Sequence, residues 1–106
     1  MHCLADGRVV VWEPETPCGE IACYAEPLDA EPRPNAVRRF GLPRGRVAFA
    51  CAWSRAHVAA SLVGEPVWSW LARGRRRPGG PHVRTQTFVR PELGLVVSLG
   101  MKRRPD

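Results

Sequence analysis

The sequence predicts an α+β fold: a small, mostly antiparallel sheet of about five strands that could close into a barrel-like arrangement, with one short helical pair inserted before a C-terminal hairpin. Three observations predict it. Short β-branched or alternating apolar segments recur along the chain. One segment between them has apolar residues at helical spacing and ends at a glycine. Eleven prolines and ten glycines among 106 residues keep the elements short, and the length suits a single domain, residues 1–106.

Two strands are expected in the N-terminal part. Residues 8–12 (RVVVW) form a β-branched run that predicts a strand, and residues 19–25 (GEIACYA) are expected to form a second short strand. The proline-containing segment between them indicates a hairpin loop. Residues 26–34 are acidic, contain three prolines and lack periodicity, so we expect an extended loop. Residues 35–40 are then expected to form a short strand.

Residues 46–53 (RVAFACAW) are the strongest strand candidate, because apolar residues occupy both alternating faces. Strands with two apolar faces are typical of the centre of a sheet. Ser54 follows as a predicted N-cap for a helix over residues 55–63, and Gly64 is its expected stop.

A second short helix is predicted over residues 66–73, because Pro66 suits a first helical position. Trp70 shares its expected buried face with Val67 and Leu71. Trp68 lies about 100° from Val67 around the helix, so we expect it to be more exposed.

A C-terminal hairpin completes the predicted fold. Residues 82–90 alternate, with valines and threonines on one side and His82, Arg84, Gln86, Phe88 and Arg90 on the other. The segment 91–94 is a predicted turn in which Gly94 takes a left-handed conformation. Residues 95–101 return as a strand, whose alternate side chains are expected to face inward: Leu95, Val97 and Leu99.

Charge is distributed unevenly along the chain. Residues 1–32 carry a net charge of −6 and residues 33–106 a net charge of +12, within a total of +6. Three arrangements remain open: the acidic part leaves a basic face free, covers it within the molecule, or meets the basic part of a neighbouring copy. Fifteen of the sixteen basic residues are arginine, beside one Ile, one Asn and one Gln. This composition indicates a GC-rich genome rather than selection of arginine for phosphate.

Two segments have family resemblances. The strings GRVVVW (7–12), GEI (19–21) and LPRGRVAFAC (42–51) resemble the strands of cold-shock and other OB-fold proteins, which implies a barrel-like β arrangement. That family's nucleic-acid-binding aromatics are absent around Gly19. Residues 59–78 resemble the recognition half of a phage-repressor helix-turn-helix, with a spacing about three residues too short for the usual turn and helix.

The cysteines provide a minor possibility of a zinc site, through Cys3, Cys18, Cys23 and Cys51. Structural zinc sites usually contain closely spaced pairs, and here only Cys18 and Cys23 are near each other, so buried thiols without a cofactor are favoured. Cys51 and His57 could form a nucleophile and base, but no orienting aspartate lies near them in sequence. We therefore expect a protein that is not an enzyme.

Nucleic-acid binding is the function that the sequence favours, because phosphate neutralisation needs a basic surface and single-stranded bases need aromatic side chains. The candidate residues are Trp68, Arg73, Arg75, Arg76, Arg77, Arg84, Phe88 and Arg90. The alternative is a protein-interaction or assembly subunit, such as a phage, viral or accessory component of a larger complex, that uses the charge asymmetry.

The expected partners are nucleic acid or an acidic protein surface, with a homo-oligomer or a larger complex as further options. No apolar run is long enough to predict a membrane helix. Residues 1–7 (MHCLADG) lack the basic and apolar regions of a signal peptide, so an intracellular, cytoplasmic protein is expected.

Overall fold

The computed structural model describes residues 2–4, 6–13, 19–73 and 83–103. It confirms an α+β fold with antiparallel sheets. The elements are β1 (His2–Cys3), β2 (Val9–Val10), β3 (Gly19–Pro27), α1 (Pro34–Phe40), α2 (Arg46–Val63), α3 (Val67–Ala72), β4 (Val83–Arg90), the 3₁₀ turn η2 (Pro91–Leu93) and β5 (Leu95–Arg103). Within the described ranges the strands form two open sheets, so a barrel-like closure is not supported.

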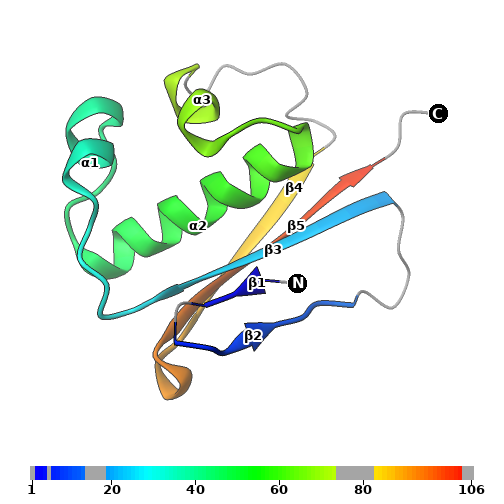
Figure 1. Ribbon diagram of the computed structural model, residues 1–106, viewed down its shortest axis with the longest axis horizontal. Coiled ribbons are helices and arrows are strands. Elements are labelled where there is room, and N and C mark those ends of the chain that lie inside the picture. Colours follow the sequence, from blue (N-terminus) through cyan, green and yellow to red (C-terminus); the bar gives the residue numbers. More distant parts are fainter. Residues whose placement is uncertain (1, 5, 14–18, 74–82, 104–106) are drawn as a thin grey trace.

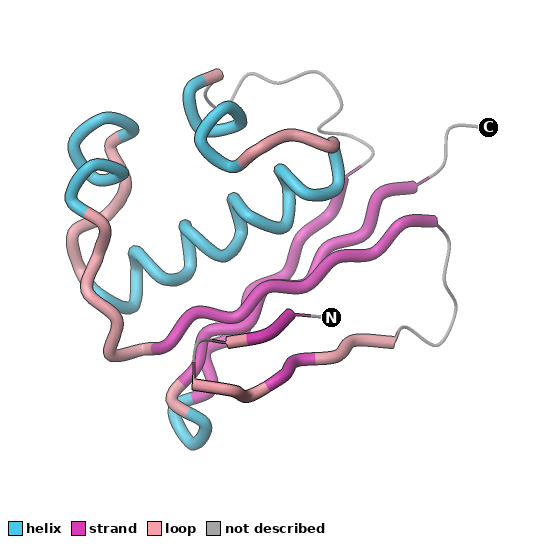
Figure 2. Tube along the Cα trace, in the orientation of Figure 1, coloured by secondary structure: helices cyan, strands magenta, loops and turns pink. Residues whose placement is uncertain are grey.

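The main sheet has three strands in the order β3-β5-β4, and β5 pairs antiparallel to both neighbours along its length. Helix α2 crosses one face of this sheet, and α1 and α3 lie against α2 on its far side (Figure 1). The β1–β2 pair packs on the opposite face of the sheet (Figure 2). The molecule is therefore layered, and α2 separates the sheet from the two smaller helices.

The predicted central strand over 46–53 is wrong, because these residues form the first half of the 18-residue helix α2. Alanine, the best helix former, occupies three of these eight positions. In the helix, Phe49 and Trp53 lie one turn apart and are both buried. A short run that is apolar on every side fits a strand or a helix. Here the run continues without a break into the predicted helix, and a helix can extend over the combined length.

Ser54 is consequently not an N-cap. It lies in the middle of α2, fully buried against the sheet, and Gly45 is the residue at the N-cap. The predicted stop is confirmed, because Gly64 ends the helix in a left-handed conformation with φ of 74°. The helical pair before the hairpin exists as α2 and α3, but its first member is long.

Two N-terminal predictions also need correction. Residues 35–40, predicted as a strand, belong to helix α1, which begins at Pro34 and ends at Gly41 with φ of 67°. The strand at residues 9–10 pairs with β1 rather than with β3, so the predicted hairpin of 8–12 with 19–25 does not form. The sequence could not show whether residues 9–10 pair with β1 or with β3, because both neighbours along the chain could form an antiparallel pair with them.

The C-terminal hairpin is confirmed, with β4 and β5 joined by η2 and a left-handed Gly94 with φ of 66°. The face of β5 that meets α2 is the opposite of the predicted one. Ser98 and Gly100 contact the helix, whereas Leu95 and Val97 face the β1–β2 pair. Because β5 is the central strand, both of its faces are partly covered. The alternation of side chains in the sequence therefore could not show which face of β5 meets α2.

Candidate nucleic-acid interface

The face of the main sheet that points away from α2 carries most of its free basic charge. We call it the outer face. Side chains alternate across a strand, so the contact of Ser98 with α2 assigns every other position. The outer face therefore contains Ile21, Cys23 and Ala25 of β3, Leu95, Val97, Leu99, Met101 and Arg103 of β5, and Arg84, Gln86, Phe88 and Arg90 of β4. None of these residues is acidic.

One end of the outer face is covered by the β1–β2 pair. Leu4 forms a buried cluster with Ala25 and Leu95, and Val10 packs against it. The Cys23 thiol donates a 3.7 Å hydrogen bond to the Val10 carbonyl oxygen. The remainder of the face is more open: Ile21 is 40% exposed, and Leu99 and Met101 are half-buried. Phe88, also half-buried, lies opposite Val97 and so borders the covered end.

Three of the predicted site residues lie on this face. Arg84, Phe88 and Arg90 all lie on β4, an edge strand, and both arginines are exposed. The Arg90 guanidinium carbon lies 5.4 Å from the centre of the Phe88 ring, a cation–π arrangement. Arg84 and Arg90 are about 20 Å apart along the strand, at roughly 3.3 Å per residue. Phe88 thus lies between two basic groups beside an apolar surface.

None of the ion pairs among the described residues joins the acidic N-terminal part to Arg84, Arg90 or Arg103. Glu20 and Glu26 of β3 point to the other face of the sheet. Glu26 instead pairs with Arg33, with a 3.0 Å contact, and Glu31 pairs with Arg46. Asp6 pairs with Arg8, which holds the pKa of the Asp6 carboxyl below its ordinary value.

The other predicted residues lie elsewhere. Trp68 and Arg73 belong to the α3 region, on the opposite side of the sheet from the outer face (Figure 1). Trp68 is 42% exposed, yet its ring packs against Trp53, with 5.5 Å between ring centroids. Arg73 forms an ion pair of 3.0 Å with Glu65. Arg75, Arg76 and Arg77 lie outside the described residues, so the structure does not place this part of the prediction.

A stack of three rings connects β1, β3 and α2. Tyr24 lies between His2 and His57, with 4.1 Å between ring centroids on each side. Burial, followed by the charges of Arg33 and His2, lowers the pKa of His57 from 6.5 to about 4. Its imidazole is neutral near pH 7 and packs edge-on against Trp53. This environment makes His57 a packing residue, and Cys51 lines a separate cavity.

The cysteines do not assemble into a metal site in the part of the chain that the structure covers. Cys3 is exposed on β1, Cys23 lies on the outer face, and Cys51 of α2 lines the cavity beside α1 and α3. No group of three or more His, Cys, Asp or Glu side chains among the described residues could hold a metal ion. Cys18 is outside those residues.

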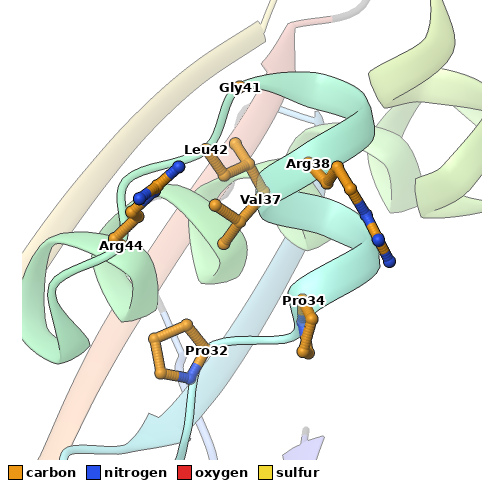
Figure 3. Close-up of a pocket in the computed structure, with 7 residues that line it drawn as sticks. All are labelled: Pro32, Pro34, Val37, Arg38, Gly41, Leu42 and Arg44. Carbon is orange, nitrogen blue, oxygen red and sulfur yellow. The ribbon is translucent and has the colours of Figure 1, made fainter.

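Two hollows border helix α1. The first, of about 670 Å³, is shown in Figure 3 and has Val37 and Leu42 at its centre, while Arg38 extends away from them. The second, of about 640 Å³, lies between the end of α1, α2 and α3. Neither hollow contains a residue predicted for nucleic-acid binding.

Sequence reasoning missed the contribution of β5 to the outer face. Leu99, Met101 and Arg103 extend the surface beside Arg84 and Phe88. Their alternation was visible in the sequence, but only the sheet order shows that β5 lies between the two other strands.

Comparisons of the chain with protein-family models, curated proteins and solved structures find no match. The OB-fold resemblance fails, because most of the third string is helical in α2. The helix-turn-helix resemblance has no support either, since α3 has six residues and packs on α2 through Trp68. Among the described residues no helix combines the length and apolarity that crossing a membrane requires. Function is therefore inferred from the site itself.

Proposed function

We propose that this protein binds single-stranded nucleic acid on the outer face of its main sheet. The observation that carries the proposal is the charge pattern of that face: Arg84, Arg90 and Arg103 border apolar side chains and Phe88, and none of the outer-face positions described on β3, β4 and β5 is acidic. Phosphates would pair with the guanidinium groups. A base would stack on Phe88, or on the guanidinium plane of Arg90 above it.

A single strand suits this surface better than a duplex. Unpaired bases can place their apolar faces on Leu99, Met101 and Phe88. In a duplex the bases are stacked inside the helix, so these three side chains would have no base to contact. The open edge of β4 places Arg84 and Arg90 beside these residues, where a backbone running along the sheet margin would pass.

Fluorescence anisotropy with labelled single-stranded RNA, single-stranded DNA and duplex tests the proposal. We expect the double variant Arg84→Ala, Arg90→Ala to weaken single-strand binding by at least about tenfold. The slope of log affinity against log salt should fall by about 1.4, since each phosphate contact on a single strand contributes roughly 0.7. Phe88→Leu keeps an apolar side chain but removes the stacking ring, and should weaken binding by about tenfold.

The matched control is Arg38→Ala with Arg44→Ala, two exposed arginines that border α1 on the helical side of the molecule. This variant removes the same charge and should leave the single-strand affinity within about twofold. Equal losses in both double variants would indicate a general charge effect and contradict the outer-face site. Loss only in the triple variant Arg75→Ala, Arg76→Ala, Arg77→Ala would move the interface to the segment after α3.

A protein-assembly role is the second candidate, favoured by the uncovered apolar side chains Ile21, Leu99 and Met101. Light scattering after size-exclusion chromatography distinguishes the two. A dimer that dissociates in the variant Ile21→Asp, while nucleic-acid affinity stays undetectable, would favour assembly.

A further inference from the structure

The 640 Å³ cavity on the helical side of the molecule is bounded by three elements. Its floor is one stripe of α2, and its walls are the end of α1 with the following loop on one side and α3 on the other. The lining residues are Phe40, Gly41, Leu42, Pro43, Ala48, Cys51, Ala52, Arg55, Ala56, Trp70 and Leu71. The volume lies within the range of about 300–1,000 Å³ that is common for small-ligand sites.

The cavity exists because the floor residues are small. Ala48, Cys51, Ala52 and Ala56 recur at helical spacing, so they share one face of α2 and fill little of the space above it. The neighbouring stripe of α2 carries Trp53, which is 3% exposed and fills the adjacent core. A large side chain fills the space beside one stripe of α2, and small side chains leave the space beside the other stripe open. The cavity therefore follows from the size of the residues on α2.

The walls are apolar, and among the described lining residues Arg55 is the one charged side chain. Trp70 and Leu71 of α3 line the cavity together with Leu42 and Phe40. Arg55 is exposed, and its Nε donates a 3.3 Å hydrogen bond to the Thr87 hydroxyl. This contact orients the guanidinium, and no contact of its two terminal nitrogens is found among the described residues. Those two nitrogens can bind a carboxylate in a bidentate way.

We propose that this cavity binds an apolar carboxylate, such as a medium-length acyl chain, with its chain against Trp70 and Leu71 and its carboxylate on Arg55. The charge of the lining supports an anion, because Arg55 has no acidic counterpart among the lining residues. The apolar walls support a ligand whose remaining surface is hydrocarbon. The cavity and the outer face lie on opposite sides of the sheet, so this inference does not rest on nucleic-acid binding.

Protection of Cys51 from a maleimide reports occupancy directly, because its thiol lines the cavity. Modification of each cysteine is followed by peptide mass spectrometry, with octanoate as the probe, below its micelle concentration. We expect octanoate to slow modification of Cys51 in a saturable way. Cys3 is exposed on β1, away from the cavity, and should react at an unchanged rate. A quench or shift of the intrinsic tryptophan fluorescence, to which Trp70 contributes, should follow the same concentration dependence.

Octanol, which has the same chain without the charge, separates the carboxylate from the hydrocarbon contribution. We expect its protection constant to be at least about tenfold weaker than that of octanoate, as for one charge-assisted hydrogen-bonded pair. Arg55→Gln should remove this difference while leaving octanol unchanged. Equal protection by octanol and octanoate in the natural protein would overturn the proposal and indicate a groove for an apolar partner surface.

Two cavity-filling variants, Ala52→Leu and Ala48→Leu, should each abolish protection by octanoate. Ala48 is exposed, so its replacement leaves the core intact even if Ala52→Leu disturbs the fold. The variant Arg84→Ala, Arg90→Ala should retain full protection, because it alters only the outer face. Unchanged Cys51 reactivity at every octanoate concentration would overturn the proposal, whatever the outcome of the nucleic-acid experiment.

Discussion

The hydroxyl oxygens of Ser54 and Ser98 lie 2.7 Å apart, and both residues are fully buried between α2 and β5. Ser54 also donates a 3.3 Å hydrogen bond to the Cys51 carbonyl, and the Thr87 hydroxyl lies 2.9 Å from that of Ser98. One direction of donation satisfies all three: Thr87 donates to Ser98, Ser98 to Ser54, and Ser54 to the helix carbonyl. A buried polar chain of this kind pins the helix at one position along the central strand.

Breaking that chain should destabilise the protein. Ser98→Ala removes the middle hydroxyl and leaves two buried groups with fewer partners, so we expect a loss of about 1–3 kcal/mol in the free energy of unfolding. Urea denaturation measures it. Ser61→Ala, at an exposed position of α2, is the control and should stay within about 0.5 kcal/mol. The double variant Ser54→Ala, Ser98→Ala should cost less than the sum of the single variants, and strict additivity would contradict the coupling.

Gly100 permits α2 to approach the sheet closely. A Cβ atom at this position would lie 2.1 Å from the Val58 Cγ1 and 2.9 Å from the Leu62 Cδ1. Gly100→Ala should therefore cost about 1–3 kcal/mol by overpacking, as seen in a lower thermal midpoint. Adding Val58→Ala makes room and should recover part of the loss. Gly45→Ala, where a Cβ meets no atom within 4 Å, should change stability by under about 1 kcal/mol.

His57 predicts a pH-dependent stability. Its folded-state pKa is about 4, below the ordinary 6.5, so between these values the unfolded chain binds the proton and the folded chain does not. The free energy of unfolding should consequently fall as the pH decreases from about 6.5 towards 4, by on the order of 1 kcal/mol for a half-buried ring. His57→Phe keeps the ring stack and should flatten this slope in urea titrations. Carboxylates titrate equally in both proteins, so identical slopes would rule out the contribution of His57.

Substitutions of Glu26 and Arg33, which form an ion pair, should lower the free energy of unfolding by different amounts. The Glu26 side chain is 5% exposed and that of Arg33 is 42% exposed, with its guanidinium 4.7 Å from the Trp53 ring centre. Arg33→Ala leaves a buried carboxylate without its cation, so we expect a loss of about 2–3 kcal/mol. Glu26→Gln leaves a cation that water can still reach and should cost about 1 kcal/mol less. A larger loss for Glu26→Gln would contradict this explanation.

Among the predicted site residues, the sequence was sufficient to place those on one strand together and insufficient where the position of another element matters. The alternation of residues 82–90 correctly predicted that Arg84, Phe88 and Arg90 share a face, because side-chain direction within a strand is a local property. The sequence also predicts Trp68 as a site residue, because basic residues follow it. The fold places Trp68 on the other side of the sheet instead, against Trp53. Distance in space between two elements is not encoded in the pattern of either one.

The sequence by itself determined the α+β class, the helix stops at Gly64 and the turn at Gly94, and the C-terminal hairpin, since each depends on local backbone preferences. Tertiary structure alone decided that residues 46–53 are helical and that Ser98 and Gly100, rather than Leu95 and Val97, meet α2. The physical reason is the same in both cases. An apolar segment can be buried in more than one conformation and on more than one face, and only the elements packed against it select between them.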